Sequence, residues 1–309
     1  SSAASDVYKR QASDTSFVTL TNSGTEVARL QLTHSNPVMK NNENRFLTYG
    51  IGSASYEISS FDETLYSGNA ENKIYTGDVA SNGTYCLVTE DNGYLTTLYA
   101  YSKNNNRIYK YSFSEYYITS VAINKDGSGC VATGVSSDKG SAVTGVYVLD
   151  FSQEKPVSTY KISGDSVLDC KYLTSDTAVL VGSQASYIVK KGEKNYKTVS
   201  YEDKTLSNYC FNTDTSTYTM ALSRSGDGRS VALISYNSNG EAQYTINTEH
   251  KADSLSVYKG TVAILDGNVV YGYNQNGDLL YSTNSGTGSK KIAVSYTHLR
   301  AHETVLDLV

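Results

Sequence analysis

The chain has 309 residues, with 26 basic and 31 acidic side chains and a formal net charge of −5 at pH 7. The acidic excess is small and the charges are scattered, so the sequence has no electrostatic footprint for nucleic acid or for an anionic membrane surface. Tyrosine occurs 28 times and glycine 24 times, against two prolines and no tryptophan. Because tyrosine suits half-buried strands and glycine suits tight turns, the composition indicates an all-β protein.

Both ends of the chain resemble translated sequencing-library adapter. Val7-Tyr8-Lys9-Arg10 can be encoded GTG TAT AAG AGA C, and the reverse complement of that DNA encodes Val294-Ser295-Tyr296-Thr297-His298. Ends of this kind are left out of reasoning about a fold. We therefore divide the chain into an adapter-like segment 1–11, a propeller domain 12–293 that is truncated at both ends, and an adapter-like segment 294–309. Any membrane anchor would then lie outside this sequence.

The native part begins with two expected strands, Phe17–Leu20 and Glu26–Leu32, which supply only the outer half of a repeat. From Pro37 onward, a unit of four short strands recurs every ~36 to 49 residues. The first strand of each complete unit is expected at Pro37–Asn41, Ile74–Ala80, Ile118–Asn124, Val167–Leu173, Leu206–Asn212 and Ser254–Tyr258. A further unit would open at Lys290–Ala293.

Turn residues separate the strands within a unit. After Ile118–Asn124, the glycine-containing turn Lys125–Gly129 leads into Cys130–Thr133, and strands at Val146–Phe151 and Val157–Ile162 complete the unit. Glycine and asparagine accept the positive φ of tight hairpins. An asparagine-rich turn joins the third and fourth strands at Asn104–Asn106, Asn237–Gly240 and Asn274–Gly277.

Repeats of this length with four strands each predict a β-propeller of four-stranded blades. Seven blades result if the N-terminal half-repeat and the strand at Lys290–Ala293 share one blade, and eight result if each belongs to its own blade. We favour seven. In either case, ring closure is incomplete in this fragment.

The cysteines follow the repeat, with at most one in each unit. Cys86, Cys130, Cys170 and Cys210 are spaced by about 40 residues and form no Cys-x-x-Cys pair. We expect free thiols, buried as small hydrophobic side chains, and neither disulfides within a repeat nor a metal knuckle.

The sequence predicts no catalytic residue, no cofactor and no metal ligand set. It has no Gly-x-Ser-x-Gly nucleophile motif, and the two histidines of the native part, His34 and His250, are far apart in sequence. Asp78 and Asp169 lie on expected first strands without a matching cluster of carboxylates. Asn274–Asp278 imitates a calcium loop but lacks the downstream glutamate, so we interpret it as hairpin chemistry.

Candidate binding residues follow from strand direction. Because the strands alternate in direction, the loops from second to third strands and from each fourth strand to the next unit share one face. That face should collect the residues Tyr116, Tyr117, Asp138, Lys139, Arg224, Arg229 and His250.

Several segments resemble an uncharacterised bacterial domain-of-unknown-function family of WD40-like propellers. They are Asn36–Lys40, Leu65–Ile74, Gly83–Thr89, and Val146–Phe151 with Pro156–Ser158. The resemblance extends over nearly all of residues 15–293. It implies a propeller usually carried behind an N-terminal membrane anchor, and hence an extracytoplasmic location, and it transfers no catalytic residue.

We therefore expect a non-enzymatic, monomeric interaction propeller displayed at the bacterial cell surface. Its partner would be a protein or a cell-envelope polymer, with no nucleic acid and no cofactor. The alternative is a propeller hydrolase or lactonase-type enzyme with a metal or carboxylate site at the channel mouth. Fold alone does not decide between them, because propellers host enzymes as well as scaffolds.

Overall fold

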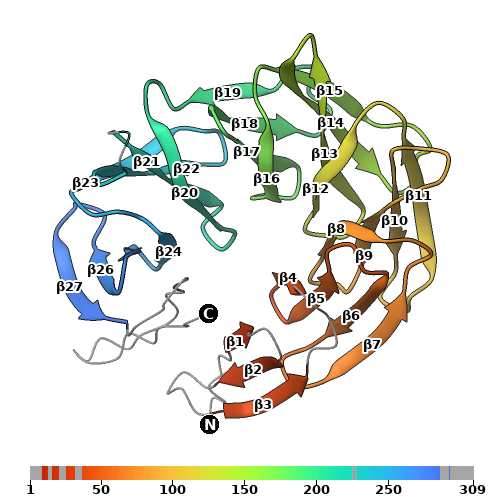
Figure 1. Cartoon of the computed structure of the whole chain (residues 1–309), viewed down its shortest axis with the longest axis horizontal. Coiled ribbons are helices and arrows are strands. Elements are labelled where there is room, and N and C mark those ends of the chain that lie inside the picture. The colour runs from red at the N-terminus through yellow and green to blue at the C-terminus, as the bar shows by residue number, and fades with distance from the viewer. Residues whose placement is uncertain are drawn as a thin grey trace. The chain divides into compact units, whose positions relative to one another are not determined.

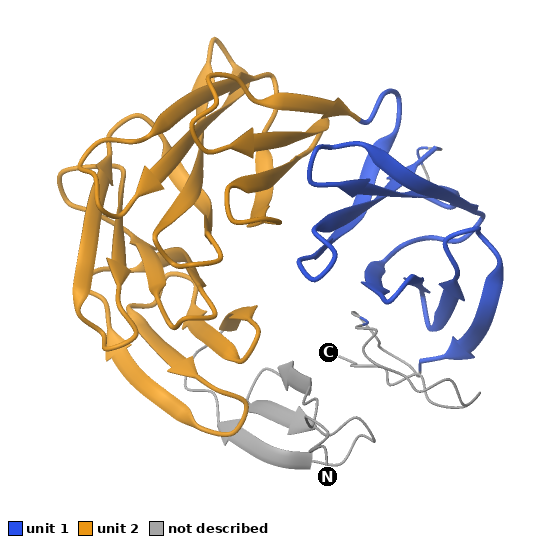
Figure 2. Ribbon diagram, turned by 180° about the vertical axis from the view of Figure 1, so that it is seen from behind, with its two compact units in different colours: residues 1–31, 201–309 blue, residues 32–200 orange. Residues whose placement is uncertain are grey.

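A computed structural model describes residues 9–12, 16–20, 26–31, 37–224, 226, 228–285 and 292. Regular structure in this part of the chain consists of β-strands. Among these residues no helix is long and apolar enough to cross a membrane. The chain divides into two compact units, residues 1–31 with 201–309 as unit 1 and residues 32–200 as unit 2 (Figure 2).

Unit 2 contains four antiparallel sheets of four strands each. The first two sheets are β4 (Pro37–Asn42), β5 (Arg45–Gly50), β6 (Ser55–Ser59), β7 (Thr64–Asn69), and β8 (Ile74–Val79), β9 (Tyr85–Thr89), β10 (Thr96–Tyr101), β11 (Arg107–Phe113). The next two are β12 (Tyr117–Ile123), β13 (Gly129–Asp138), β14 (Ser141–Asp150), β15 (Ser158–Ser163), and β16 (Val167–Tyr172), β17 (Thr177–Gly182), β18 (Ala185–Lys190), β19 (Lys197–Ser200). In Figure 1, β4, β8, β12 and β16 follow the inner side of this unit, and β7, β11, β15 and β19 follow its outer side.

Unit 1 contains two further four-stranded sheets and one three-stranded sheet. The four-stranded sheets are β20 (Thr205–Asn212), β21 (Thr217–Ser223), β22 (Val231–Asn237), β23 (Ala242–Thr248), and β24 (Ser254–Tyr258), β25 (Thr261–Asp266), β26 (Val269–Tyr273), β27 (Leu279–Asn284). The three-stranded sheet consists of β1 (Lys9–Ala12), β2 (Ser16–Leu20) and β3 (Glu26–Gln31).

The repeat predicted from the sequence is confirmed. All six expected first strands are present with ends within one residue of the prediction, and strands pair antiparallel in chain order within every sheet. The expected N-terminal strands are β2 and β3, and β1 adds a strand that pairs with β2. The strand expected at Lys290–Ala293 falls on residues that, apart from Ile292, lie outside the described part, so seven and eight blades both stay open.

Burial follows the position of a strand in its sheet. The second strands β9 and β17 are buried along their whole length, whereas the fourth strands β7 and β27 alternate between exposed and half-buried residues. Interior strands that are covered on both faces carry continuous apolar runs, and a strand with one solvated face alternates. Side chains from successive sheets of unit 2 share a core, as Cys86, Leu98, Cys130 and Leu149 do.

One connection differs from the prediction. A loop was expected between Thr133 and Val146, but β13 and β14 continue as ten-residue strands and meet at a two-residue turn. Lys139 and Gly140 both have positive φ, 50° and 82°, which is the geometry of a type I′ hairpin. A turn of this kind matches the twist of the paired strands. β13 and β14 pair with each other beyond the residues that pair with β12 and β15, so their hairpin extends past those two strands.

The cysteines are free thiols, as predicted. Cys86, Cys130 and Cys170 are buried and Cys210 is half-buried. Burial, with a smaller contribution from Asp169, raises the pKa of Cys170 to about 12. The pKa of Cys210 is also raised to about 12, again by burial. Because the thiolate is the reactive form, these thiols are inert packing groups.

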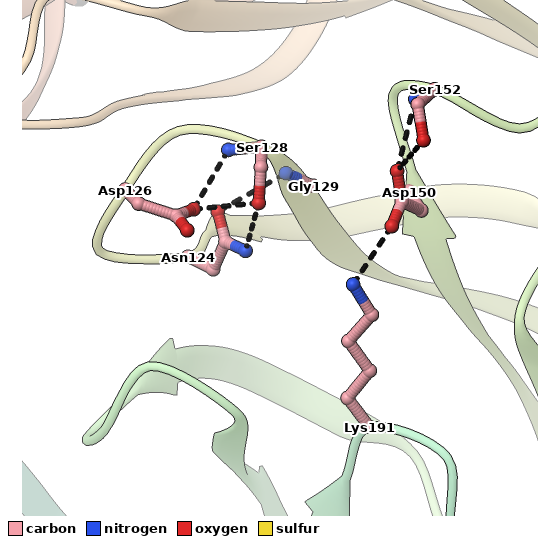
Figure 3. Close-up of polar contacts among 7 residues, drawn as sticks. All are labelled: Asn124, Asp126, Ser128, Gly129, Asp150, Ser152 and Lys191. Carbon is pink, nitrogen blue, oxygen red and sulfur yellow. Dashed lines mark hydrogen bonds and ion pairs between the residues drawn. The ribbon is translucent and has the colours of Figure 1, made fainter.

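A polar network links the turns of two sheets in unit 2 (Figure 3). Nζ of Lys191, after β18, lies 2.8 Å from a carboxylate oxygen of Asp150, which ends β14. The other Asp150 oxygen accepts hydrogen bonds from the backbone N–H and the hydroxyl of Ser152. In the adjacent β12–β13 turn, Asn124 accepts a hydrogen bond from the backbone N–H of Gly129.

This network predicts an acid-sensitive contribution to stability. The hydrogen bonds from Lys191 and then from Ser152 lower the pKa of Asp150 to about 2, from an ordinary value of 3.8. A lowered carboxyl pKa contributes stability that is complete above the ordinary pKa and is lost as the pH falls through the folded-state pKa. The wild type should therefore exceed Asp150→Asn in stability at about pH 5 and lose that advantage toward about pH 2.

Urea unfolding followed by circular dichroism at several pH values between these limits would measure the difference. Lys191→Met is the matched variant, because it removes the ion pair and leaves Ser152 in place. Its stability should depend less on pH between these limits than the stability of the wild type. A stability difference between wild type and Asp150→Asn that is the same at every pH would contradict the prediction.

Candidate functional site

Three neighbouring first strands of unit 2 share a β-bulge near their beginnings. The pairing register shifts between Ile74 and Thr76 in β8, between Ile118 and Ser120 in β12, and between Val167 and Asp169 in β16. Each shift leaves one extra residue without a partner opposite it, and these residues are Tyr75, Thr119 and Leu168. β-bulges redirect side chains and are frequent next to functional sites.

Each bulge follows a buried aliphatic residue whose backbone N–H is held by another element. Ile74 donates to the carbonyl oxygen of Ser53 at 2.8 Å, and Ile118 donates to the Thr96 hydroxyl at 3.3 Å. Val167 donates to the Thr144 hydroxyl at 3.1 Å. These bonds fix where each first strand enters its sheet, and so they fix the place of the bulge.

Exposed apolar side chains occur at this end of the sheets of unit 2. Ile51 lies between the second and third strands of its sheet and Tyr94 occupies the same position in the next sheet, while Tyr117 begins β12. These three residues and Leu168 are each more than half exposed, and Tyr75 is half-buried. We name the five residues Ile51, Tyr75, Tyr94, Tyr117 and Leu168 the loop-end patch.

Contacts at the loops and first strands relate three members of the loop-end patch, Ile51, Tyr75 and Tyr117, to one another. The turn after Ile51 is bonded to β8, because the N–H of Gly52 donates to the carbonyl oxygen of Ile74 at 2.9 Å. The pKa of Tyr75 is raised by burial and then by the charges of Glu90 and Tyr117. The Asp91 carboxylate shapes the loop that carries Tyr94, accepting N–H groups of Gly93 and Tyr94.

Further along the same strands, a group of charged side chains lies on β4, β8 and β16. Asp78 is 4% exposed and accepts the backbone N–H of Ile123 at 2.8 Å. Burial raises the pKa of Asp78, and Lys171 and Lys40 oppose that rise. Burial alone would lower the pKa of Lys40, but Asp169, Tyr49 and Asp78 raise it above its usual value.

In this charged group, the charges of Lys171 and Lys40 act on the buried Asp78 carboxylate. Among the residues that the structure describes, no three His, Cys, Asp or Glu side chains come together as a possible metal-binding group. The lysine charges offset part of the cost of burying Asp78, and Asp169, the other carboxylate singled out in the sequence, acts on Lys40.

A second buried carboxylate, Asp165, organises the entry to β16. It is 2% exposed and follows the last residues of β15. It closes the β17–β18 turn by accepting hydrogen bonds from the backbone N–H groups of Ser183, Gln184 and Ala185. Its own carbonyl oxygen accepts the hydroxyl of Thr144, which in turn holds Val167. Asp165 thereby connects a turn to the bulge at Leu168.

In unit 2, the structure places the candidate binding residues in different roles. Tyr117 is part of the loop-end patch. Tyr116 is half-buried and lies over Gly145, with its ring 6.2 Å from that of Tyr147. Asp138 forms an exposed ion pair with Lys161 at 3.2 Å.

The other candidates occupy turns. Lys139 forms the turn of the β13–β14 hairpin in unit 2, where it has positive φ. In unit 1, Arg224 and Arg229 lie between β21 and β22, and Arg224 donates to the side-chain oxygen of Asn247. His250 stacks on Tyr271 with ring centroids 3.6 Å apart, and its Nδ1 lies 3.4 Å from Asp266.

Reasoning from the sequence missed Tyr75, Leu168, Glu90 and Asp165. A signal for the bulges is present, since Ile74-Tyr75-Thr76, Ile118-Thr119-Ser120 and Val167-Leu168-Asp169 each join a buried aliphatic residue, a bulged residue and a polar residue. A similar triplet, beginning with a half-buried leucine, occurs with a bulge at Leu206-Ser207-Asn208 in unit 1.

The sheets and their pairing define the class of the protein as a β-propeller with four-stranded blades, and solved structures support this assignment. They include apo AztD from Citrobacter koseri (TM-score 0.59, 8% identity, covering 91% of this chain and 86% of that one) and the C-terminal WD40 domain of Sif2 (TM-score 0.58, 14% identity, 93% and 78%). BamB from Moraxella catarrhalis is also similar (TM-score 0.55, 11% identity, 86% and 80%). At these identities, the likeness shows the fold alone.

Residues 11–301 match the family of unknown function DUF5711, and the chain belongs to that family. This confirms the resemblance to a domain-of-unknown-function family of propellers. No curated protein matches the chain significantly.

Proposed function

We propose that this chain is a non-enzymatic interaction propeller displayed at the bacterial cell surface, with the loop-end patch of unit 2 as its contact surface. The observation that carries the proposal is the exposure of Ile51, Tyr94, Tyr117 and Leu168 at one end of neighbouring sheets. Exposed large apolar side chains that lie close together mark interaction sites, because leaving them in water costs free energy that a partner recovers.

The chemistry around the patch supports binding over catalysis. Asp91, Asp165 and Asp78 each accept hydrogen bonds from backbone N–H groups, and these bonds position loops and strands. A general base needs a free acceptor within reach of a substrate proton. The surface location is supported by the resemblance to a family whose members are usually carried behind a membrane anchor.

The test uses the bacterium that encodes the protein. A photo-crosslinking amino acid is placed at Tyr94, in the loop-end patch, or at Ile108, an equally apolar exposed position on the fourth strand β11. We expect crosslinked species from position 94 and far fewer from position 108. An antibody against the chain should also label intact cells.

Two results would contradict the proposal. Equal crosslinking from both positions would show that the loop-end patch is not the contact surface. Antibody labelling that requires permeabilised cells would show that the protein is not displayed at the cell surface.

A further inference from the structure

We infer that the loop-end patch binds a protein segment that carries a basic side chain between apolar ones. This inference rests on the proposed function and adds the chemistry of the partner. It is carried by the three neighbouring bulges, by the mixture of aromatic and aliphatic side chains that they display, and by a carboxylate among them.

The bulged strands lie side by side in unit 2. The Asp78 carboxylate on β8 accepts the N–H of Ile123 on β12 at 2.8 Å. The hydroxyl of Ser120 on β12 lies 3.1 Å from the Cys170 sulfur on β16. The bulged residues Tyr75, Thr119 and Leu168 therefore form a row across adjacent strands, and a linear segment can contact all three.

The apolar composition of the patch favours protein over carbohydrate. Ile51 and Leu168 are aliphatic and are both more than half exposed. Sugar rings stack on aromatic faces, and their hydroxyl groups need hydrogen-bond partners, which aliphatic side chains do not offer. Leucine or isoleucine side chains of a peptide that pack on Ile51 and Leu168 are removed from water, which favours binding. The tyrosines add a large apolar area that ends in a polar hydroxyl.

The local charge favours a basic residue in the partner. Glu90 follows β9, and its backbone N–H donates to the carbonyl oxygen of Lys73, two residues before Tyr75, at 2.8 Å. The loop beside it contains Asp91, whose pKa is lowered by the N–H of Gly93 and the hydroxyl of Thr97, so this carboxylate stays ionised. A lysine or arginine is attracted both by a carboxylate and by the faces of tyrosine rings.

Selection from a library of random short peptides displayed on phage tests the inference, with the full chain immobilised. We expect enriched peptides in which a lysine or arginine lies between apolar residues. Leu168→Ser and Tyr117→Ser should each weaken a selected peptide by about tenfold or more, as truncation of a central contact does. Glu90→Gln should weaken binding and reduce its dependence on salt.

Leu65→Ser is the matched control, because Leu65 is exposed on the fourth strand β7, away from the patch. It should leave the affinity unchanged. Circular dichroism and urea midpoints of all variants separate loss of binding from loss of folding.

Three outcomes would overturn the inference: no enriched peptide, enriched peptides without a basic residue, or binding of soluble peptidoglycan fragments that Leu168→Ser abolishes. If the crosslinks from position 94 form while peptide selection fails, the surface function stands and only the partner chemistry is wrong. If both fail, the proposed function falls as well.

Discussion

Replacing Asp165 by alanine should lower the free energy of unfolding by about 3 kcal/mol or more. The carboxylate is buried and accepts hydrogen bonds from two elements at once. Its donors are the backbone N–H of Ser166 (2.7 Å), the N–H and hydroxyl of Ser183 (2.9 and 2.6 Å), the N–H groups of Gln184 and Ala185, and the Tyr187 hydroxyl (2.8 Å). Each buried donor left without an acceptor costs about 1–3 kcal/mol.

Two other variants show whether the loss comes from this network. Asp165→Asn keeps one acceptor oxygen and should cost less than the alanine variant. Asp138→Asn removes an exposed ion pair with Lys161 and should cost at most about 1 kcal/mol. Urea unfolding measures all three, and an unchanged midpoint for Asp165→Ala would show that the network contributes nothing net.

Gly145→Ala should destabilise the protein by about 1–3 kcal/mol, because the site has no room for a methyl group. A Cβ at this position would lie 2.5 Å from Cε2 of Tyr116. The Tyr116 side chain also lies beside Gly134, where a Cβ would be 2.8 Å from the Tyr116 Cβ. The Tyr116 side chain thus packs against two glycines at the end of the sheet that carries Tyr117.

Gly93→Ala is the control for the change of residue type. Its nearest neighbour would be an Asp91 carboxylate oxygen at 3.7 Å, and its φ is not positive. We expect a change within about 0.5 kcal/mol. In a Tyr116→Ser background, Gly145→Ala should lose most of its effect, and additive losses would show that the clash with Tyr116 is not the cause.

Local patterns in the sequence were sufficient for the strands and most turns. The turn at Asn274–Gly277 shows why, because its geometry is set by its own residues. The Asn274 side-chain oxygen accepts the N–H groups of Asn276 and Asp278, and its amide donates to the Asp278 carboxylate. Asn237 makes the equivalent bonds to the N–H groups of Asn239 and Glu241. Interactions over two to four residues can be read from a single sequence.

The same local reasoning failed where strand length depended on pairing. Residues 134–145 contain no long apolar run, so a loop was expected there. In the structure, Val135 pairs with Thr144 and Ser137 pairs with Ala142, around a turn in which Lys139 and Gly140 take positive φ. The energy gained when the two strands pair decides that this segment is a hairpin, and the residue pattern of either strand alone does not.

By itself, the sequence determined the all-β class, the four-stranded repeat, the first strand of each unit and the free thiols. The periodicity of apolar residues, the turn residues and the spacing of the repeats can be recognised in the sequence without knowledge of tertiary contacts. Only the tertiary structure decided the bulges that display Tyr75 and Leu168, the buried position of Asp165, and the compensation of Asp78 by lysines on other strands. These features depend on partners on other strands and turns, and such partners are specified by strand pairing and by packing between sheets.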